Sequence, residues 1–233
     1  MARRARARRG VVGRPAGVSE RAAARYDAWY RTPRGAWIGE REFNLLHRAL
    51  APRPGETLLD VGCGTGYFTR LFAQRTGVQV VGLDPNLDWL AFARDAGTPA
   101  CVAGRAERLP FRDASFDLSI AVTSLCFIRA QAEALREIVR VTRRRLALGL
   151  LNRRSLLYLQ KGRGGGAGAY RGAHWHTAAE VRALFAPMPV RDLRLENAIF
   201  LPGGGPIART VERALTERVL LGGFLLAVAD VAR

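Results

Sequence analysis

The sequence has few cysteines, and their spacing does not suit a metal site. Only Cys63, Cys101 and Cys126 occur in 233 residues, without a C-x-x-C pair or a set of histidines nearby. An odd number of scattered cysteines argues against both a disulfide framework and a zinc site. Each one lies in or beside a predicted strand, where cysteine commonly serves as a small buried hydrophobe. We therefore expect no metal.

Long hydrophobic runs are also missing. The nearest candidate, residues 219–228, is too short to span a bilayer, which takes about 18 apolar residues. Hydrophobic residues make up 48% of the chain and charged residues 24%, which is close to ordinary globular usage. The sequence predicts a cytoplasmic protein without a membrane span, as a monomer or homodimer, with one α/β domain over residues 19–233.

Lysine is almost absent, because Lys161 is the only one, although the formal net charge is +17. The excess positive charge is therefore arginine. Residues 1–18 hold six arginines and no acid, and such a block predicts a disordered basic tail. We favour a solvated tail, while contact with nucleic acid, a targeting role and a misassigned start codon remain open.

What the sequence does contain is a glycine-rich turn in residues 57–68, TLLDVGCGTGYF. A short apolar run ends at Asp60, three glycines follow at alternate positions, and helix-compatible residues then resume, which predicts strand, tight turn and helix. Glycine permits positive φ and lets a ligand approach main-chain N–H groups. The glycines are Gly62, Gly64 and Gly66.

The spacing around this turn narrows the class of ligand. The dinucleotide fingerprint is G-x-G-x-x-G, whereas this turn reads G-x-G-x-G with Asp60 directly before it. A carboxylate there repels a pyrophosphate and favours a ligand with an amine and a sulfonium. A second apolar run, residues 78–83, ends at Asp84, so that a βαβ unit would place a second acid nearby, suited to ribose hydroxyls.

This stretch resembles the nucleoside-binding half of the class I S-adenosylmethionine-dependent methyltransferases. Residues 104–117, GRAERLPFRDASFD, resemble the segment that lies along the adenine in the small-molecule, type 11-like branch of that family. The resemblance covers residues 40–150 well and the two ends less. It implies a three-layer, Rossmann-like α/β sandwich with a seven-stranded, mostly parallel sheet and an antiparallel last strand. It also implies S-adenosylmethionine as cofactor and a small-molecule methyl acceptor.

The resemblance assigns roles to individual residues. Asp60 would serve the amino group of the cofactor, Asp84 would hold the ribose, and Ala106 would offer its backbone N–H to adenine. The full set of expected cofactor-binding residues is Tyr26, Asp60, Gly62, Cys63, Gly64, Thr65, Gly66, Asp84, Pro85, Arg105, Ala106, Glu107 and Thr123. One residue departs from the pattern, because the family usually has an acid where this chain has Arg105; Glu107 or the main chain could replace it.

Two helices are predicted before the glycine turn, over residues 19–30 and 40–50, with a break at 32–35. By resemblance, residues 19–50 form an N-terminal helical lid over the cofactor. Two aromatic side chains are candidates for the lid's inner face, against ordinary core packing: Tyr26 and Trp37.

Alternating elements after the turn imply a parallel sheet with ligands at the carboxyl ends of its strands. Strands are predicted over 100–103, 117–122, 146–151, 190–198 and 223–229, and helices over 86–96, 131–141, 177–185 and 207–219. The helix at 177–185 has a capping box of Thr177 and Glu180. Residues 152–176 are glycine-rich and predict a flexible loop.

The sequence indicates less about the methyl acceptor than about the cofactor. Two histidines in the glycine-rich segment, His174 and His176, are candidates for a general base, against simple packing or exposure. The Asn-Pro-Pro-Tyr motif of amino-group methylases is absent after the fourth strand, where residues 124–127 read SLCF, which argues against exocyclic amine chemistry. Two alternatives stay open: an RNA or protein methyltransferase that uses the basic tail, and a non-catalytic S-adenosylmethionine-binding protein.

Overall fold

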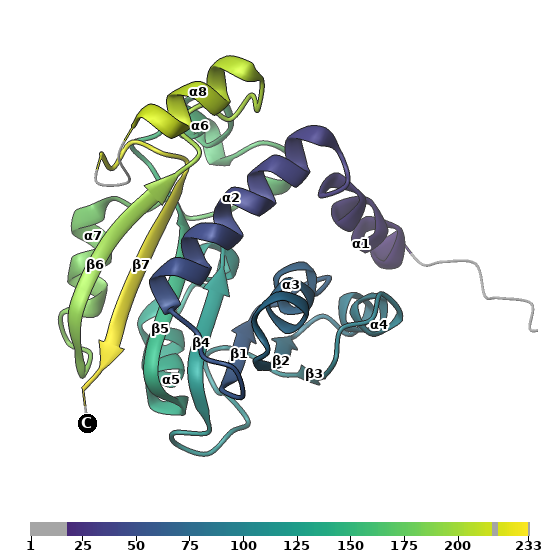
Figure 1. Cartoon of the computed structure of the whole chain (residues 1–233), viewed down its shortest axis with the longest axis vertical. Helices are drawn as coiled ribbons and strands as arrows, with labels where there is room; N and C mark the ends of the chain where they lie inside the picture. The colour runs from purple at the N-terminus through teal and green to yellow at the C-terminus, as the bar shows by residue number, and fades with distance from the viewer. Residues whose placement is uncertain (1–17, 216–218, 233) are drawn as a thin grey trace, which may run out of the picture.

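A seven-stranded sheet forms the centre of the computed structural model, which describes residues 18–215 and 219–232 (Figure 1). Its strands stand in the order β3-β2-β1-β4-β5-β7-β6. Their bounds are β1 Thr57–Val61, β2 Gln79–Asp84, β3 Cys101–Ala103, β4 Phe116–Val122, β5 Thr142–Leu151, β6 Val190–Ala198 and β7 Phe224–Val231.

The direction of the strands confirms the predicted sheet. Strands β3, β2, β1, β4 and β5 pair in parallel, whereas β7 runs antiparallel to both β5 and β6. The central strands β1, β4 and β5 are mostly apolar and buried, as expected of parallel strands covered on both faces. The chain is thus a Rossmann-like α/β sandwich whose last strand is antiparallel.

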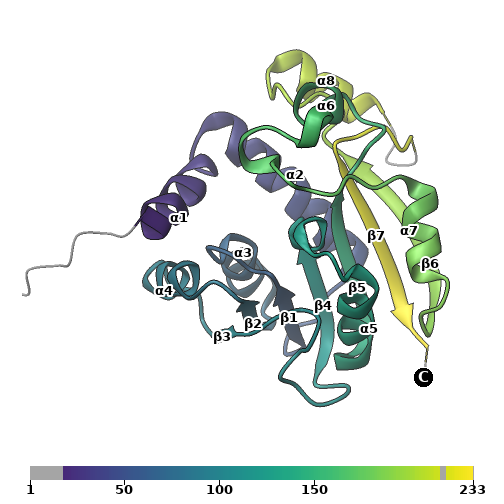
Figure 2. The ribbon, with the colours of Figure 1, turned by 180° about the vertical axis from the view of Figure 1, so that it is seen from behind.

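Helices cover both faces of the sheet. On one face α2 crosses β5 and β7 (Figure 1), and on the other face α5 and α7 lie against the strands (Figure 2). The α-helices are α1 Val18–Trp29, α2 Pro33–Leu50, α3 Tyr67–Thr76, α4 Leu87–Asp95, α5 Gln131–Val141, α6 Leu156–Lys161, α7 Ala178–Phe185 and α8 Pro206–Ala214. None of the helices in the described part of the chain is long and apolar enough to cross a membrane.

Two apolar clusters hold these layers together. Leu46 of α2 and Phe72 of α3 pack with the strands on one face, and Leu135 of α5 and Phe185 of α7 pack on the other. All four side chains are almost fully buried, and each buried side chain of this size contributes about 1.5 to 3 kcal/mol. The sheet therefore has a continuous core on each side.

The second helix begins earlier than predicted. Residues 32–35 were expected to break the helical pattern, but α2 starts at Pro33. The Thr32 side chain accepts a hydrogen bond from the Gly35 backbone N–H at 3.0 Å, and proline at the first helical position has a suitable φ and no N–H to leave unpaired. The helical pattern does break, at residues 30–32 between α1 and α2, but Pro33 to Gly35 already belong to α2.

The predicted loop at 152–176 also has more structure than expected. It contains the helix α6, whose N-cap Ser155 accepts from the backbone N–H of Tyr158 at 3.1 Å. Trp175 is buried against the rings of Tyr158 and Tyr170. The aromatic rings that pack here all belong to this segment, and its glycine content does not indicate such packing.

Other predicted boundaries of helices and strands lie closer to the observed ones. The capping box of Thr177 and Glu180 is confirmed at the start of α7, and β6 has the predicted bounds. The basic helix predicted over 207–219 is shorter, because α8 ends at Ala214. The predicted tail, residues 1–18, lies outside the described residues except for its last one.

The pairing of β5 with β7 generates a stability prediction. A Cβ at Gly149 of β5 would lie 2.3 Å from the Phe224 ring of β7. We expect Gly149→Ala to lower the free energy of unfolding by about 1 to 3 kcal/mol, as overpacked cores do, in a urea titration. The matched control is Gly203→Ala, since nothing lies within 4 Å of that Cβ position. An equal loss in both variants would contradict the packing explanation.

Candidate functional site

The order of the strands in the sheet has a switch point between the neighbouring strands β1 and β4. Strands β2 and β3 extend the sheet on one side of β1, and β4 and β5 extend it on the other. In open α/β sheets, ligands bind at the carboxyl ends of the strands at such a switch point. Here the point is flanked by the glycine turn after β1 and by the 3-10 helix η1, Ser124–Phe127, after β4.

Close packing joins these two segments. The Ser124 hydroxyl donates to the Val61 carbonyl at 2.6 Å. Gly62 has a φ of +74°, and a Cβ there would lie 2.3 Å from the Ser124 Cβ. Thr123, just before η1, also has a positive φ of 57° and donates its N–H to the Gly149 carbonyl. Only glycine fits at position 62, because both the backbone conformation and the space exclude a side chain.

Hydrogen bonds to β2 define the shape of the glycine turn. The N–H groups of Gly62 and Cys63 donate to the Leu83 carbonyl at 2.6 and 3.0 Å. The Gly64 N–H donates to the Asp84 carboxylate at 2.9 Å. The predicted βαβ unit placed Asp84 beside the turn, and the structure brings the two into direct contact.

Both oxygens of the Asp84 carboxylate accept hydrogen bonds from backbone N–H groups. One carboxylate oxygen accepts from Gly64, and the other accepts from the Asn86 N–H at 2.9 Å. Burial raises the pKa of this carboxyl, and the two backbone donors act in the opposite direction. Pro85 and the residues that follow it, up to Asp88, line an open hollow at the start of α4.

Asp60 is the buried acid of the site. Its carboxylate accepts from the Thr69 hydroxyl of α3 at 2.6 Å, and its side chain is almost fully buried. Burial raises its pKa to about 7, and the negative charge of Asp84 acts in the same direction. A cationic ligand group near Asp60 would favour its ionised form.

Thr65 has a polar atom that the surrounding chain leaves unpaired. Its hydroxyl is buried and has no hydrogen-bond partner among the described residues. Its neighbour Cys63 lies close to Gly82, where an added Cβ would be 2.8 Å from the sulfur, and burial raises the pKa of that thiol. Gly66, with a φ of +76°, begins α3 as its N-cap. The backbone of residues 62–66 is called the glycine cradle below. An unpaired buried hydroxyl in this cradle fits a site that is completed by a ligand.

The segment after β3 positions Ala106 at the same edge of the sheet. Ala106 is buried, and the Arg105 guanidinium pairs with the Glu107 carboxylate at 2.8 Å. The backbone N–H of Leu109 donates to Glu137 of α5 at 2.8 Å, which anchors the segment to the sheet's other layer. Glu107, one of the two alternatives to the family's usual acid, is therefore paired with Arg105.

The first helix reaches the glycine turn through aromatic contacts. Tyr26 of α1 packs on the Trp89 ring of α4 with centroids 5.3 Å apart, and its hydroxyl lies 3.3 Å from that of Tyr30. A Cβ at Gly64 would lie 3.2 Å from Trp89. Trp37, the other aromatic candidate, lines a separate cavity between α2 and α8.

An ion pair fastens α1 to the same turn. The Arg70 guanidinium of α3 pairs with Asp27 of α1 at 2.6 Å, and both side chains are largely buried. The same guanidinium donates to the Thr65 carbonyl at 2.6 Å. The position of α1 and the backbone of the glycine turn are therefore coupled through one arginine.

The two histidines lie next to each other but in different environments. Their ring centroids are 4.5 Å apart, with His174 exposed and His176 buried. The Nε2 atom of His176 lies 3.0 Å from the Gln131 amide oxygen, and Nδ1 faces the Cys126 sulfur of η1 at 4.0 Å. Burial and the charge of His174 lower the pKa of His176 to about 4, so that it is neutral at pH 7. Their role as a general base stays a prediction.

Sequence analysis missed Glu42 of α2. This half-buried carboxyl has a pKa raised to about 8 by burial, and its charge acts on the phenols of Tyr26, Tyr30 and Tyr170. The signal was present, since α2 buries Ile38, Leu45, Leu46 and Ala49 and residue 42 falls on that stripe. An acid on the apolar stripe of an amphipathic helix indicates a functional group.

The described residues contain no group of three or more histidine, cysteine, aspartate or glutamate side chains that could hold a metal ion. The acids of the site are instead directed at backbone N–H groups and hydroxyls, as described for Asp60 and Asp84. The arrangement offers oxygen acceptors and main-chain donors at the edge of a glycine cradle, which suits a nucleoside with hydroxyl and amino groups.

Comparison with known proteins agrees with this geometry. Residues 59–146 match the family model for a methyltransferase domain. An uncharacterized protein from Mycobacterium tuberculosis is 34% identical over 220 residues, which cover 91% of this chain and 72% of that protein. A malonyl-[acyl-carrier protein] O-methyltransferase from Serratia marcescens is 36% identical over 129 residues, 55% of this chain and 48% of that enzyme.

Solved structures show the same fold. A SAM-dependent methyltransferase from Thermotoga maritima, described as a possible histamine N-methyltransferase, superposes with a TM-score of 0.70 at 23% identity, over 91% of this chain and 96% of that one. At this identity the likeness concerns the fold alone. With the family model, the relatives and the glycine cradle together, the chain belongs to the class I S-adenosylmethionine-dependent methyltransferases, in the type 11-like branch.

Proposed function

We propose that this enzyme transfers the methyl group of S-adenosylmethionine to an oxygen atom of a small-molecule acceptor. The observation that supports it most is the glycine cradle hydrogen-bonded to Asp84 at the switch point of the sheet. Two relatives from Serratia and Penicillium are named O-methyltransferases, which favours oxygen as the acceptor atom. The sequence of η1 differs from the Asn-Pro-Pro-Tyr motif of amino-group methylases.

The residues at the cradle fit this cofactor. Asp84 would hold the ribose and Asp60 the amino group, while the unpaired Thr65 hydroxyl is available to complete the site. Ala106, on the segment after β3, would donate its N–H to adenine. The bound cofactor supplies a methyl group that a sulfonium already activates. The protein has to position the acceptor and, for a hydroxyl acceptor, remove its proton.

Glu42 is our preferred general base. A base works best when its pKa lies near the working pH, and burial brings the pKa of Glu42 to about 8. The half-buried carboxyl lies on α2, and its charge acts on the phenols of Tyr26 and Tyr170. His176 is the alternative, but both of its ring nitrogens already face partners.

The remaining features of the protein are part of the same proposal. Residues 19–233 form one domain, residues 19–50 act as its lid, and the enzyme works in the cytoplasm as a monomer or homodimer. The link from Asp27 through Arg70 to the glycine turn supports the lid, because it couples α1 to the cradle. The alternative of RNA or protein as substrate depends on residues 1–18, and no structural observation favours it.

Isothermal titration with S-adenosylmethionine and, separately, with S-adenosylhomocysteine tests the proposal. We expect micromolar dissociation constants for both ligands. Methyl transfer from a radiolabelled cofactor to hydroxylated or carboxylated acceptors would then identify the substrate. A folded sample that binds neither ligand would overturn the proposal, whereas binding of both ligands without turnover of any acceptor would favour the non-catalytic alternative.

The assignment of Asp84 to the ribose predicts a specific loss. We expect Asp84→Ala to weaken cofactor binding by at least about 1 kcal/mol, as loss of a hydrogen bond to a charged group does. The matched control is Asp95→Ala, an exposed acid at the far end of α4. Titration calorimetry on both variants checks it, and wild-type affinity in Asp84→Ala would refute the assignment.

The burial of Glu42 predicts a pH-dependent stability. Its folded pKa of about 8 exceeds the ordinary value of 4.5, so the folded state retains a proton that the unfolded chain releases. Stability should therefore fall as the pH rises between these two values. We expect Glu42→Gln to gain about 1 to 2 kcal/mol relative to wild type from pH 5 to pH 8.5, after allowance for partial exposure.

Urea unfolding at several pH values measures this difference. The control variant is Glu133→Gln, an exposed glutamate on α5, which should follow the wild-type pH dependence. Asp60 titrates in all three proteins and so cancels in the comparison. A parallel pH dependence of Glu42→Gln and wild type would show that the Glu42 carboxyl is ordinary.

A further inference from the structure

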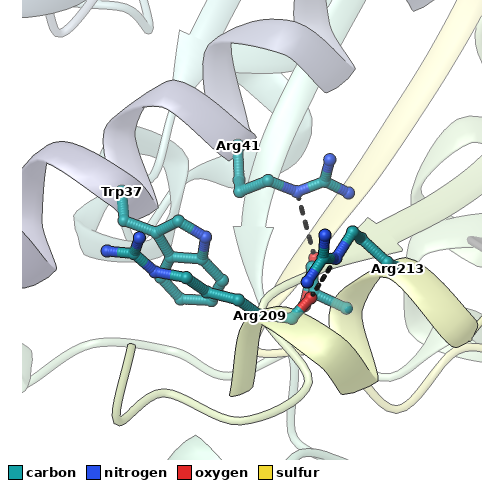
Figure 3. Close-up of a pocket in the computed structure, with 5 residues that line it drawn as sticks. Trp37, Arg41, Arg209 and Arg213 are labelled. Atoms are coloured by element: carbon teal, nitrogen blue, oxygen red, sulfur yellow. Dashed lines mark hydrogen bonds and ion pairs between the residues drawn. The ribbon is translucent and has the colours of Figure 1, made fainter. Parts of the chain in front are cut away.

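A cavity of about 380 Å³ lies between α2 and α8, and it is rich in arginine. Its lining comes from two helices that are about 170 positions apart in the sequence, and Figure 3 shows these side chains converging from both. The lining residues are Trp37, Arg41, Arg209, Glu212 and Arg213. A volume of a few hundred Å³ is typical of a small-molecule site.

The one acid in this cavity is already fully engaged. The Glu212 carboxylate accepts from the backbone N–H groups of Ile199 and Phe200 at 2.8 and 3.0 Å, and the Arg41 Nε atom lies 3.5 Å away. Its side chain is 2% exposed. Glu212 therefore joins α8 to the end of β6 and compensates at most one of the three guanidinium groups.

The other two guanidinium groups have unused donors. Arg209 donates through Nε to the Gly204 carbonyl, and Arg213 donates through Nε to the Arg209 carbonyl, both at 3.3 Å. No acid in the described part of the chain pairs with either side chain. Both are exposed, so their terminal nitrogens remain available to a ligand. The Nε of Arg41 is itself buried without a hydrogen bond in the described structure.

An aromatic wall completes the cavity. The half-buried Trp37 indole lies one helical turn before Arg41 and faces Arg209 in Figure 3. Gly204, in the loop before α8, has a φ of +73°, and a Cβ there would lie 3.4 Å from Trp37 and 3.2 Å from Arg34. The glycine lets this loop approach α2 closely, which brings α8 and its arginines to the indole.

We infer that this cavity binds the phosphate group of a small molecule that also has a planar or apolar part. Guanidinium groups match the geometry of phosphate oxygens through paired N–H donors, and the indole offers a face to a ring. The cavity is distinct from the cofactor site, which lies at the ends of β1 and β2. The inference does not depend on the identity of the methyl acceptor.

Titration calorimetry of the full chain with phenyl phosphate, at constant ionic strength, tests the inference. We expect saturable binding of phenyl phosphate, weaker binding of inorganic phosphate because it lacks a ring, and no binding of phenol. The double variant Arg209→Gln with Arg213→Gln should lose at least about tenfold in affinity. Both side chains are exposed, so the variant should fold, and an unchanged melting temperature would confirm it.

A charge-matched variant separates a built site from general electrostatic attraction. Arg136→Gln with Arg182→Gln removes two exposed arginines from α5 and α7, on the other face of the sheet. It should bind phenyl phosphate within about twofold of wild type. An equal loss in both double variants would overturn the inference, as would the absence of saturable binding in the wild type.

The phosphate could also belong to a lipid headgroup, and a second arm distinguishes this source. Sedimentation with phosphatidic acid vesicles should retain wild type and the Arg209 and Arg213 variant to the same extent, because the attraction of a chain with net charge +17 to an anionic surface does not require this cavity. Vesicle binding that the Arg209 and Arg213 variant abolishes, without any titration by phenyl phosphate, would overturn the small-molecule assignment.

Discussion

The hydrogen bonds between the glycine turn and the second strand are the constraint on which the rest of the site depends. The N–H groups of Gly62 and Cys63 converge on one carbonyl at the end of β2, and the next glycine N–H reaches the Asp84 carboxylate. Residues 62 and 64 adopt positive φ, and a side chain there would meet Ser124 or Trp89, so glycine is the residue that fits this turn. This places an acid, a buried hydroxyl and free space at the switch point of the sheet.

The first helix, α1, is joined to that turn by an ion pair and by aromatic contacts. Arg70 is the central residue, since one guanidinium contacts both the turn carbonyl of Thr65 and the buried Asp27 of α1. The aromatic contacts from Tyr26 to Trp89 reinforce the same arrangement. A buried ion pair of this kind is costly to break, because removal of one partner leaves a buried charge uncompensated. The position of α1 is thus sensitive to the shape of the cofactor cradle.

How far the sequence could be interpreted depended on whether the deciding contacts were local. The glycine turn, the capping box of Thr177 and Glu180, and the acid after β2 follow from short-range rules of backbone conformation and strand length, and these predictions were correct. The start of α2 was wrong because proline and glycine were interpreted as a break, although the Thr32 side chain makes them a helix start. The segment with α6 was missed because its stability comes from the buried Trp175, packed between two tyrosines.

The sequence by itself determined the family and the succession of strands, because both follow from local motifs and from apolar runs along the chain. The tertiary structure showed that Glu42 is half-buried with a raised pKa, and it alone brought Trp37 and Arg41 together with Arg209 and Arg213. Those groups meet because β6 and β7 return α8 to the side of α2. Convergence of segments so distant in the chain depends on how the layers pack, and periodicity within a single segment does not encode it.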